Sequence, residues 1–182
     1  MSIISVIKQS AGKYIFYRKL NNLKRNKKLV NLNEAKTVGI VYNVTNQEIF
    51  KKVKLLIKDL TTAKRQVMAI GFVNRKSIPD YCIAAYSGYY FDQKDLNWFG
   101  GPKNEYIKEF INKEWDILID LCMEDVFVIQ FISGLSKSRL KVGRYSENHK
   151  KYYDLMIKVN NSLSIDTFIE QILHYLLIIK SK

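Results

Sequence analysis

The stretch TVGIVYNVTNQEIFKKVKLLIKDLTTAKRQVMAIGFV, residues 37–73, decides the fold class of this 182-residue chain. Its first six residues are a β-branched run between polar residues, which is typical of a buried strand. Asn46 is a helix-capping residue, and the apolar residues that follow it recur at helical spacing. Residues 67–73 form a second apolar run. Strand, helix and strand at this spacing predict a parallel βαβ unit.

The C-terminal half continues the alternation of strands and helices. DILIDL, residues 116–121, is the clearest parallel-strand sequence in the chain. We expect one or two short strands within 82–91, helices over 105–113 and 125–133, a short strand over 140–143, an apolar segment over 155–159, and a final helix capped by Ser164. The sequence therefore predicts an α/β fold, with a Rossmann-like open and mostly parallel sheet and helices on both faces.

Charge distinguishes the N-terminal residues from the rest of the chain. The net charge is +13, with 30 Lys and Arg against 17 Asp and Glu, and residues 1–30 contain eight basic residues and no acid. Apolar residues, Tyr14 among them, recur loosely at helical spacing over residues 10–30. We therefore predict a basic amphipathic helical segment within residues 1–32, followed by a Rossmann-like α/β domain over residues 33–182.

Basic residues in such numbers attract polyanions, because binding releases the polyanion's counterions. A second basic cluster, KSRLKVGR over residues 137–144, lies on a predicted strand, where alternation turns the charged side chains onto one face or edge. Our leading hypothesis is a noncatalytic domain that binds RNA or an RNA–protein assembly such as the ribosome. The predicted contacts are Arg18, Lys19, Lys24, Arg25, Lys27, Lys28, Lys137, Arg139, Lys141 and Arg144.

Two alternatives explain the same charges. A charged edge strand over residues 137–144 would discourage aggregation between sheets. A basic amphipathic helix preceded by Ile3, Ile4, Val6 and Ile7 could instead lie on an anionic membrane surface. Polar residues interrupt the apolar stretch near the C-terminus, so we expect no membrane span.

The carboxyl edge of the predicted sheet is the expected place for a small ligand, because ligands of open α/β sheets bind there. Asn43, Gly71 and Asp120 lie at that edge. Glu124 and Asp125, in the turn after Asp120, could act as acid and base or hold a magnesium ion, or they could cap the next helix. No glycine-rich turn follows the first strand and no P-loop sequence occurs, so we predict no cofactor.

The histidines, cysteines and loop aromatics leave the chemistry open. His149 lies in a polar stretch, which favours a surface loop, and His174 flanks the last helix, so neither a metal site nor a catalytic triad is indicated. Trp98 and Phe99 lie on a loop where they either stack on bases or cover the core. The two cysteines are interpreted as reduced core thiols, and with no signal-peptide pattern this favours the cytoplasm.

Four stretches carry a resemblance to known families: WDILIDL at 115–121, ISGLS at 132–136, RLKVGR at 139–144 and YDLMI at 153–157. Together they resemble an uncharacterised protein family of Bacteroidota, which has no assigned activity. Their order also resembles part of the N-terminal half of heptosyltransferase-type glycosyltransferases, which have two Rossmann-like domains. That second likeness spans residues 36–160 and implies the architecture, with no catalytic residue carried over. It implies, as an alternative function, a small or degenerate transferase-like enzyme with a nucleotide or sugar ligand at the sheet edge.

Overall fold

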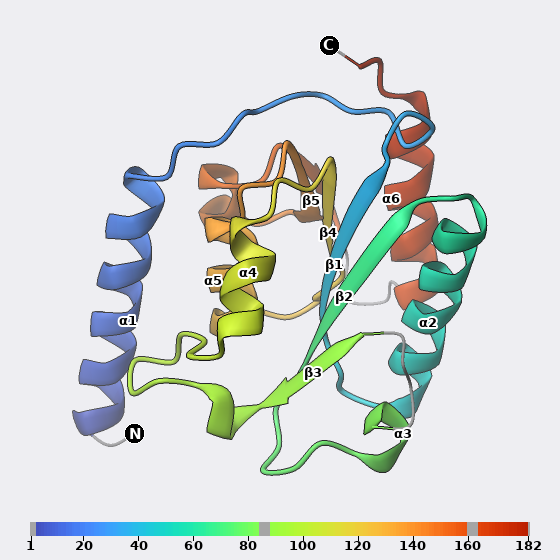
Figure 1. The fold of residues 1–182 in the computed structure, drawn as a ribbon. Helices are drawn as coiled ribbons and strands as arrows, with labels where there is room; N and C mark the ends of the chain where they lie inside the picture. The colour runs from blue at the N-terminus through green and yellow to red at the C-terminus, as the bar shows by residue number, and fades with distance from the viewer. Residues whose placement is uncertain (1–2, 84–87, 160–163, 182) are drawn as a thin grey trace.

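In a computed structural model, which describes residues 3–83, 88–159 and 164–181, the chain folds around a six-stranded sheet in the order β3-β2-β1-β4-β5-β6 (Figure 1). The strands are β1 Thr37–Asn43, β2 Gln66–Val73, β3 Tyr89–Asp92, β4 Ile117–Asp120, β5 Leu140–Arg144 and β6 Leu155–Ile157. Neighbouring strands are parallel throughout. The strand order reverses between β1 and β4, as in doubly wound α/β folds. The predicted fold class is confirmed.

Helices cover both faces of the sheet (Figure 1). They are α1 Ile3–Asn21, α2 Gln47–Thr62, α3 Asp80–Ile83, α4 Glu105–Asn112, α5 Phe127–Leu135 and α6 Ile165–Ile178, with 3₁₀ turns η1 Gln93–Asp95 and η2 Glu147–Lys151. On β1, Ile40 packs in the cluster that includes Phe50 of α2 and Phe168 of α6, whereas Val41 packs in the cluster that includes Phe110 of α4. The central strands are therefore buried on both faces, which explains their continuous apolar sequences.

The predicted helix caps are confirmed. The side chain of Asn46 accepts a hydrogen bond from Ile49 N at 2.9 Å, and that of Ser164 accepts one from Thr167 N at 3.2 Å. The strand expected within residues 82–91 is β3, which begins at Tyr89 and follows the short helix α3. Part of that predicted range, residues 84–87, lies outside the described residues.

The N-terminal helix differs from the one predicted over residues 10–30. It runs over Ile3–Asn21, and the chain then crosses the amino edge of the sheet without helical structure (Figure 1). Lys28 N instead donates to the carbonyl oxygen of Arg139, the residue before β5, at 3.1 Å. In a helix, this N–H would have bonded to a carbonyl of the helix itself. Tyr14, placed on the apolar stripe by the sequence, is exposed, and Phe16 is the buried residue.

Phe16 attaches α1 to the rest of the molecule. Its ring lies 6.3 Å from that of Phe127, 5.9 Å from that of Phe131 and 5.7 Å from that of Tyr152, measured between centroids. The helix can approach α5 closely because Gly134 has no side chain: a Cβ there would lie 2.6 Å from the Phe16 ring. No helix within the described ranges is long and apolar enough to cross a membrane.

Candidate functional site

A groove of about 800 Å³ lies between α1, the loop over residues 97–102, α4 and α5. We call it the basic groove, because its charged lining residues are all basic: Arg18, Lys19, Lys24, Lys108 and Lys137. Its apolar lining comes from Ile15, Leu23, Phe99, Ile111, Phe131 and Leu135. Four of the ten residues predicted to contact RNA are thus brought together from two distant parts of the sequence.

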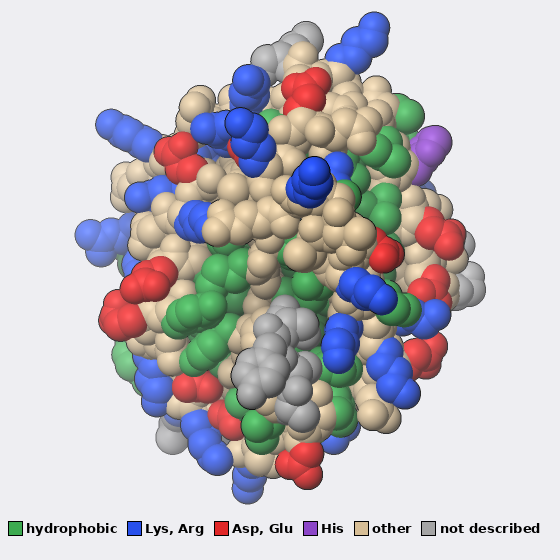
Figure 2. Space-filling model, turned by 45° about the vertical axis from the view of Figure 1, so that its right-hand side comes forward, with side chains coloured by type: hydrophobic (Ala, Val, Ile, Leu, Met, Phe, Trp, Pro, Cys, Tyr) green, Lys and Arg blue, Asp and Glu red, His purple; other side chains and the backbone are tan. Residues whose placement is uncertain are grey.

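Those four residues, Arg18, Lys19, Lys24 and Lys137, form no ion pair with any residue that the structure describes. Lys108, which the sequence analysis did not select, pairs with Glu105 on the exposed side of α4. The side of the molecule that carries α2 and α6 is different, since Lys and Arg there are interspersed with Asp and Glu (Figure 2). The basic groove therefore concentrates positive charge that the fold leaves uncompensated.

Most of the other predicted RNA contacts hold the fold together. The side chain of Arg25 is almost fully buried: its guanidinium donates to Ser138 O at 2.8 Å and pairs with Asp154. Lys27 Nζ lies 3.9 Å from the same carboxylate. Arg139 pairs with Asp116 at 3.0 Å and Arg144 pairs with Asp125, while Lys28 is exposed outside the groove. Apart from Lys28, these cations are already neutralised in part, so they are weaker candidates for phosphate contacts.

The structure contradicts the prediction that Lys141 contacts RNA. The residue is fully buried, and its Nζ donates to Gly134 O at 2.7 Å. Burial, with the Arg25 guanidinium nearby, lowers the pKa of Lys141 to about 6. Lys141 therefore presents no charge to an external phosphate. The alternative of a charged edge strand is also wrong, because β5 lies between β4 and β6.

The predicted ligand site does not form as one site. Asn43 and Asp120 lie on the face of the sheet that α4 and α5 cover, whereas Gly71 lies on the opposite face, since side chains alternate along a strand. The space at Gly71 is filled: a Cβ there would lie 2.7 Å from the Tyr90 ring and 2.9 Å from Val44. Only the first two residues share a side of the sheet.

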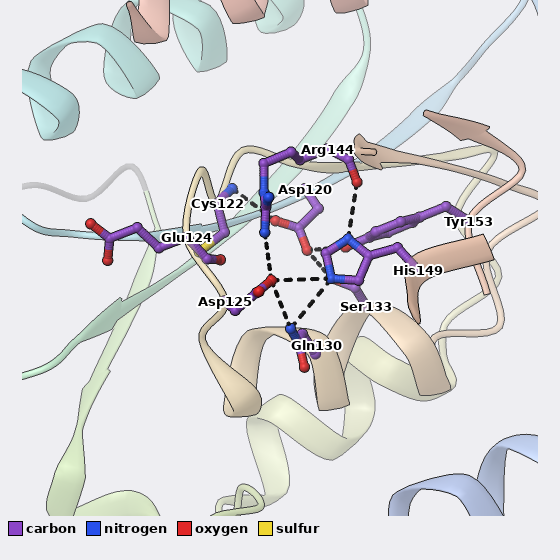
Figure 3. A network of polar contacts seen from close by, with 9 residues as sticks. All are labelled: Asp120, Cys122, Glu124, Asp125, Gln130, Ser133, Arg144, His149 and Tyr153. Atoms are coloured by element: carbon purple, nitrogen blue, oxygen red, sulfur yellow. Dashed lines mark hydrogen bonds and ion pairs between the residues drawn. The ribbon is translucent and has the colours of Figure 1, made fainter. Parts of the chain in front are cut away.

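Asp120 is the centre of a buried polar network (Figure 3). Its carboxylate accepts hydrogen bonds from Cys122 N at 2.8 Å, from Ser133 Oγ at 2.6 Å and from the Tyr153 hydroxyl. Desolvation raises the pKa of Asp120, and these hydrogen bonds oppose that shift. With its acceptor positions used by the protein itself, Asp120 serves the packing of β4 against α5.

Asp125 and His149 form the outer part of that network (Figure 3). The His149 ring is buried, which corrects the surface position predicted for it. Its Nδ1 lies 2.9 Å from Arg144 O, and its Nε2 lies 3.3 Å from Gln130 Nε2 and 3.5 Å from Asp125 Oδ1. A neutral ring with its proton on Nδ1 satisfies the first two contacts. Glu124 and Asp125 do not cap α5, because its N-cap residue is Val126, which makes no side-chain capping bond. The Glu124 side chain points away from the network (Figure 3).

The loop aromatics divide between the two predicted roles. Phe99 is partly buried against Phe131, with 6.3 Å between ring centroids, so it covers the core and lines the groove. Trp98 is 61% exposed. The sequence does not reveal Lys108 or the apolar lining of the basic groove, because nothing local in it shows that α1 packs beside α4 and α5.

The described residues contain no group of three or more His, Cys, Asp or Glu that could hold a metal ion. No curated protein matches the chain. A family model does: that of a family of unknown function, DUF6913, over residues 8–179. The match includes all four stretches on which the resemblance to an uncharacterised family rests, and it takes in most of α1 as well as the sheet. The chain therefore belongs to the DUF6913 family of unknown function.

Proposed function

We propose that the protein binds RNA, free or within an RNA–protein assembly such as the ribosome, through the basic groove. The observation that supports this most is the convergence of Arg18, Lys19, Lys24 and Lys137 on one groove without ion-pair partners among the described residues. Cations that the fold does not need for its own stability are available to phosphates. Apolar and aromatic side chains beside them suit the bases of the same ligand.

The test compares two variants with the same change in charge. Lys19→Gln/Lys24→Gln/Lys137→Gln removes three charges from the groove, and Lys51→Gln/Lys54→Gln/Lys58→Gln removes three from exposed positions of α2. Binding of a labelled single-stranded RNA is followed by fluorescence anisotropy between about 50 and 200 mM salt. We expect the groove variant to bind about tenfold or more weakly and to show a salt dependence reduced by about two units of log–log slope, at about 0.7 per phosphate contact.

Three outcomes are informative. Equal losses in the two variants would show that net charge rather than the groove attracts RNA, and would contradict the proposal. Unchanged RNA binding by the groove variant would also contradict the proposal. Flotation with anionic vesicles is the parallel assay for the membrane alternative, and binding to vesicles but not to RNA would replace the proposal with that alternative.

A second candidate function, a small ligand at the carboxyl edge of the sheet, rests on Asn43. Its side-chain oxygen is buried and has no hydrogen-bond partner among the residues that the structure describes. The residue lies at the end of β1, where the strand order reverses. Ligands of such sheets bind outside this point. Thermal melting across a panel of nucleotides and sugar nucleotides is the test. Stabilisation that Asn43→Ala abolishes would support it, and no response across the panel would contradict it.

A further inference from the structure

The two tryptophans of the chain have opposite environments. Trp115 is fully buried, and its indole nitrogen donates to Phe110 O at 2.9 Å. Trp98 is 61% exposed at the tip of the loop that borders the basic groove. Tryptophan combines a large apolar ring with one donor and is highly buried on average, so an exposed tryptophan needs an explanation.

The loop holds Trp98 in a defined position. The side-chain oxygen of Asn97 accepts hydrogen bonds from Phe99 N at 3.2 Å and from Gly101 N at 2.9 Å, and Asn97 N donates to Gly101 O at 2.8 Å. Gly100 completes the turn with a φ of 83°, a conformation that favours glycine. The exposed indole is therefore presented by an ordered turn, so binding through it would cost little ordering of the backbone.

The same loop is packed against α1. A Cβ at Gly12 would lie 2.4 Å from Phe99 O, so the helix and the loop are in direct contact at that glycine. Two contacts with neighbouring groove residues then connect Trp98 to the basic side chains. Its ring lies 5.5 Å from that of Phe99, edge to face, and Phe99 contacts Phe131, over which Lys19 Nζ lies at 5.5 Å from the ring centre.

This arrangement suits one form of RNA. A single strand offers exposed base faces next to phosphates, which match aromatic side chains next to cations. In an A-form duplex the bases are stacked inside, and proteins contact mainly the backbone and the minor groove. A groove of about 800 Å³ is within the size range of pockets that hold drug-sized ligands, so it suits a nucleotide or two.

Resting on the proposed RNA binding, we infer that the protein selects single-stranded RNA, with one unpaired base stacked on the Trp98 indole and the adjoining phosphates held by the basic groove. The indole is the sequence-tolerant contact, because every base has a π face. The cations supply affinity that depends on salt, and the indole supplies affinity that does not. The two contributions can therefore be separated by experiment.

The experiment measures binding of three RNAs of equal length: a single strand, the same strand without bases at its centre, and a duplex. Trp98→Leu is compared with Tyr175→Leu, which removes another exposed aromatic from α6, on the opposite side of the sheet. We expect Trp98→Leu to weaken binding of the intact single strand about fivefold to a hundredfold, with an unchanged salt slope. Neither the abasic strand nor the duplex should distinguish Trp98→Leu from the native chain.

Tryptophan emission supplies a second readout, because Trp115 is buried and the exposed Trp98 should account for most of the response. Single-stranded RNA should quench the emission and protect it from acrylamide. Binding of the duplex as tight as that of the single strand, or an unaltered Trp98 emission while RNA binds, would overturn the inference and leave the proposed function in place. Failure of all three RNAs to bind would contradict both the inference and the proposed function.

Discussion

Lys141 shows how far the environment of one residue can depart from its expected role. A lysine within a basic run is normally solvated, yet this one lies inside the sheet with the Gly134 carbonyl as its partner. Burial and the neighbouring guanidinium of Arg25 lower the pKa of Lys141 to about 6, so the amine is mostly uncharged at neutral pH. In the unfolded chain the same amine keeps its ordinary pKa of about 10.4.

The first prediction concerns the pH dependence that follows. Between pH 9 and pH 6.5 the unfolded chain carries this proton and the folded chain mostly does not, so the free energy of unfolding falls with decreasing pH by up to about 1.4 kcal/mol per unit. Lys141→Met removes that contribution. We expect the variant to gain about 1–3 kcal/mol relative to the native chain at pH 6.5, and less at pH 9. Urea unfolding at the two pH values measures both. A loss of stability at both pH values would mean that the hydrogen bond from the amine to Gly134 O stabilises the fold by more than burial of the amine costs.

The basic residues also show what a sequence can and cannot predict at this scale. The number of cations near the N-terminus is evident from the sequence, and so is the chemistry they favour. The sequence does not show which of these cations form ion pairs, because the partner of Arg25 is Asp154 and that of Arg139 is Asp116, each far away in the chain. The burial of His149 was missed for the same reason, since Asp125 and Gln130 become its neighbours only when the fold forms.

The helices and strands were predictable where each depends on its own sequence. The caps at Asn46 and Ser164 and the apolar runs of β1 and β4 are local signals, and the structure confirms them. The helix α1 was placed too far along the chain because its docking residues are few. Among the α1 residues whose burial the structure describes, Gly12 and Phe16, four residues apart, are the buried ones, and a glycine carries no apolar signal.

The second prediction tests how α1 docks. Gly134→Ala places a methyl group where the Phe16 ring lies, and overpacking of this kind costs about 1–3 kcal/mol, which the better helix propensity of alanine offsets by about 1 kcal/mol. We expect a lower free energy of unfolding and faster proteolysis of α1. The double variant Gly134→Ala/Phe16→Leu should recover part of the loss, because the smaller side chain makes room. Additive effects in this double-mutant cycle would show that the two residues do not act through their contact.

At the scale of the whole molecule, the N-terminal segment and the sheet share buried contacts. Phe16 packs against α5, Arg25 pairs with Asp154, and Val30 and Leu32 belong to the main core. Division of the chain into residues 1–32 and 33–182, made from charge alone, remains a prediction that stability measurements can test.

The third prediction is that residues 33–182 by themselves are much less stable than the full chain. Loss of one buried phenylalanine costs about 3–5 kcal/mol, a large part of the usual 5–15 kcal/mol of a domain. Thermal melting by circular dichroism and binding of a dye to exposed apolar surface measure the effect. Deletion of residues 1–8, where Val6, Ile7 and Lys8 are exposed, is the control and should change little. Equal stability of the two shortened chains would establish the division at residue 32.

The path between α1 and β1 has a consequence for the order in which the molecule is completed. Asn31 Nδ2 donates to Leu177 O and to Ile179 O, both at 2.8 Å, and Leu32 N donates to Leu176 O. Synthesis begins at the N-terminus, so these residues leave the ribosome long before the last helix exists to hold them. Asn31 and Leu32 are therefore made well before the helix that fixes them. A chain that stalls before α6 carries all the positive charge of the N-terminal segment without the contacts that hold this segment in place.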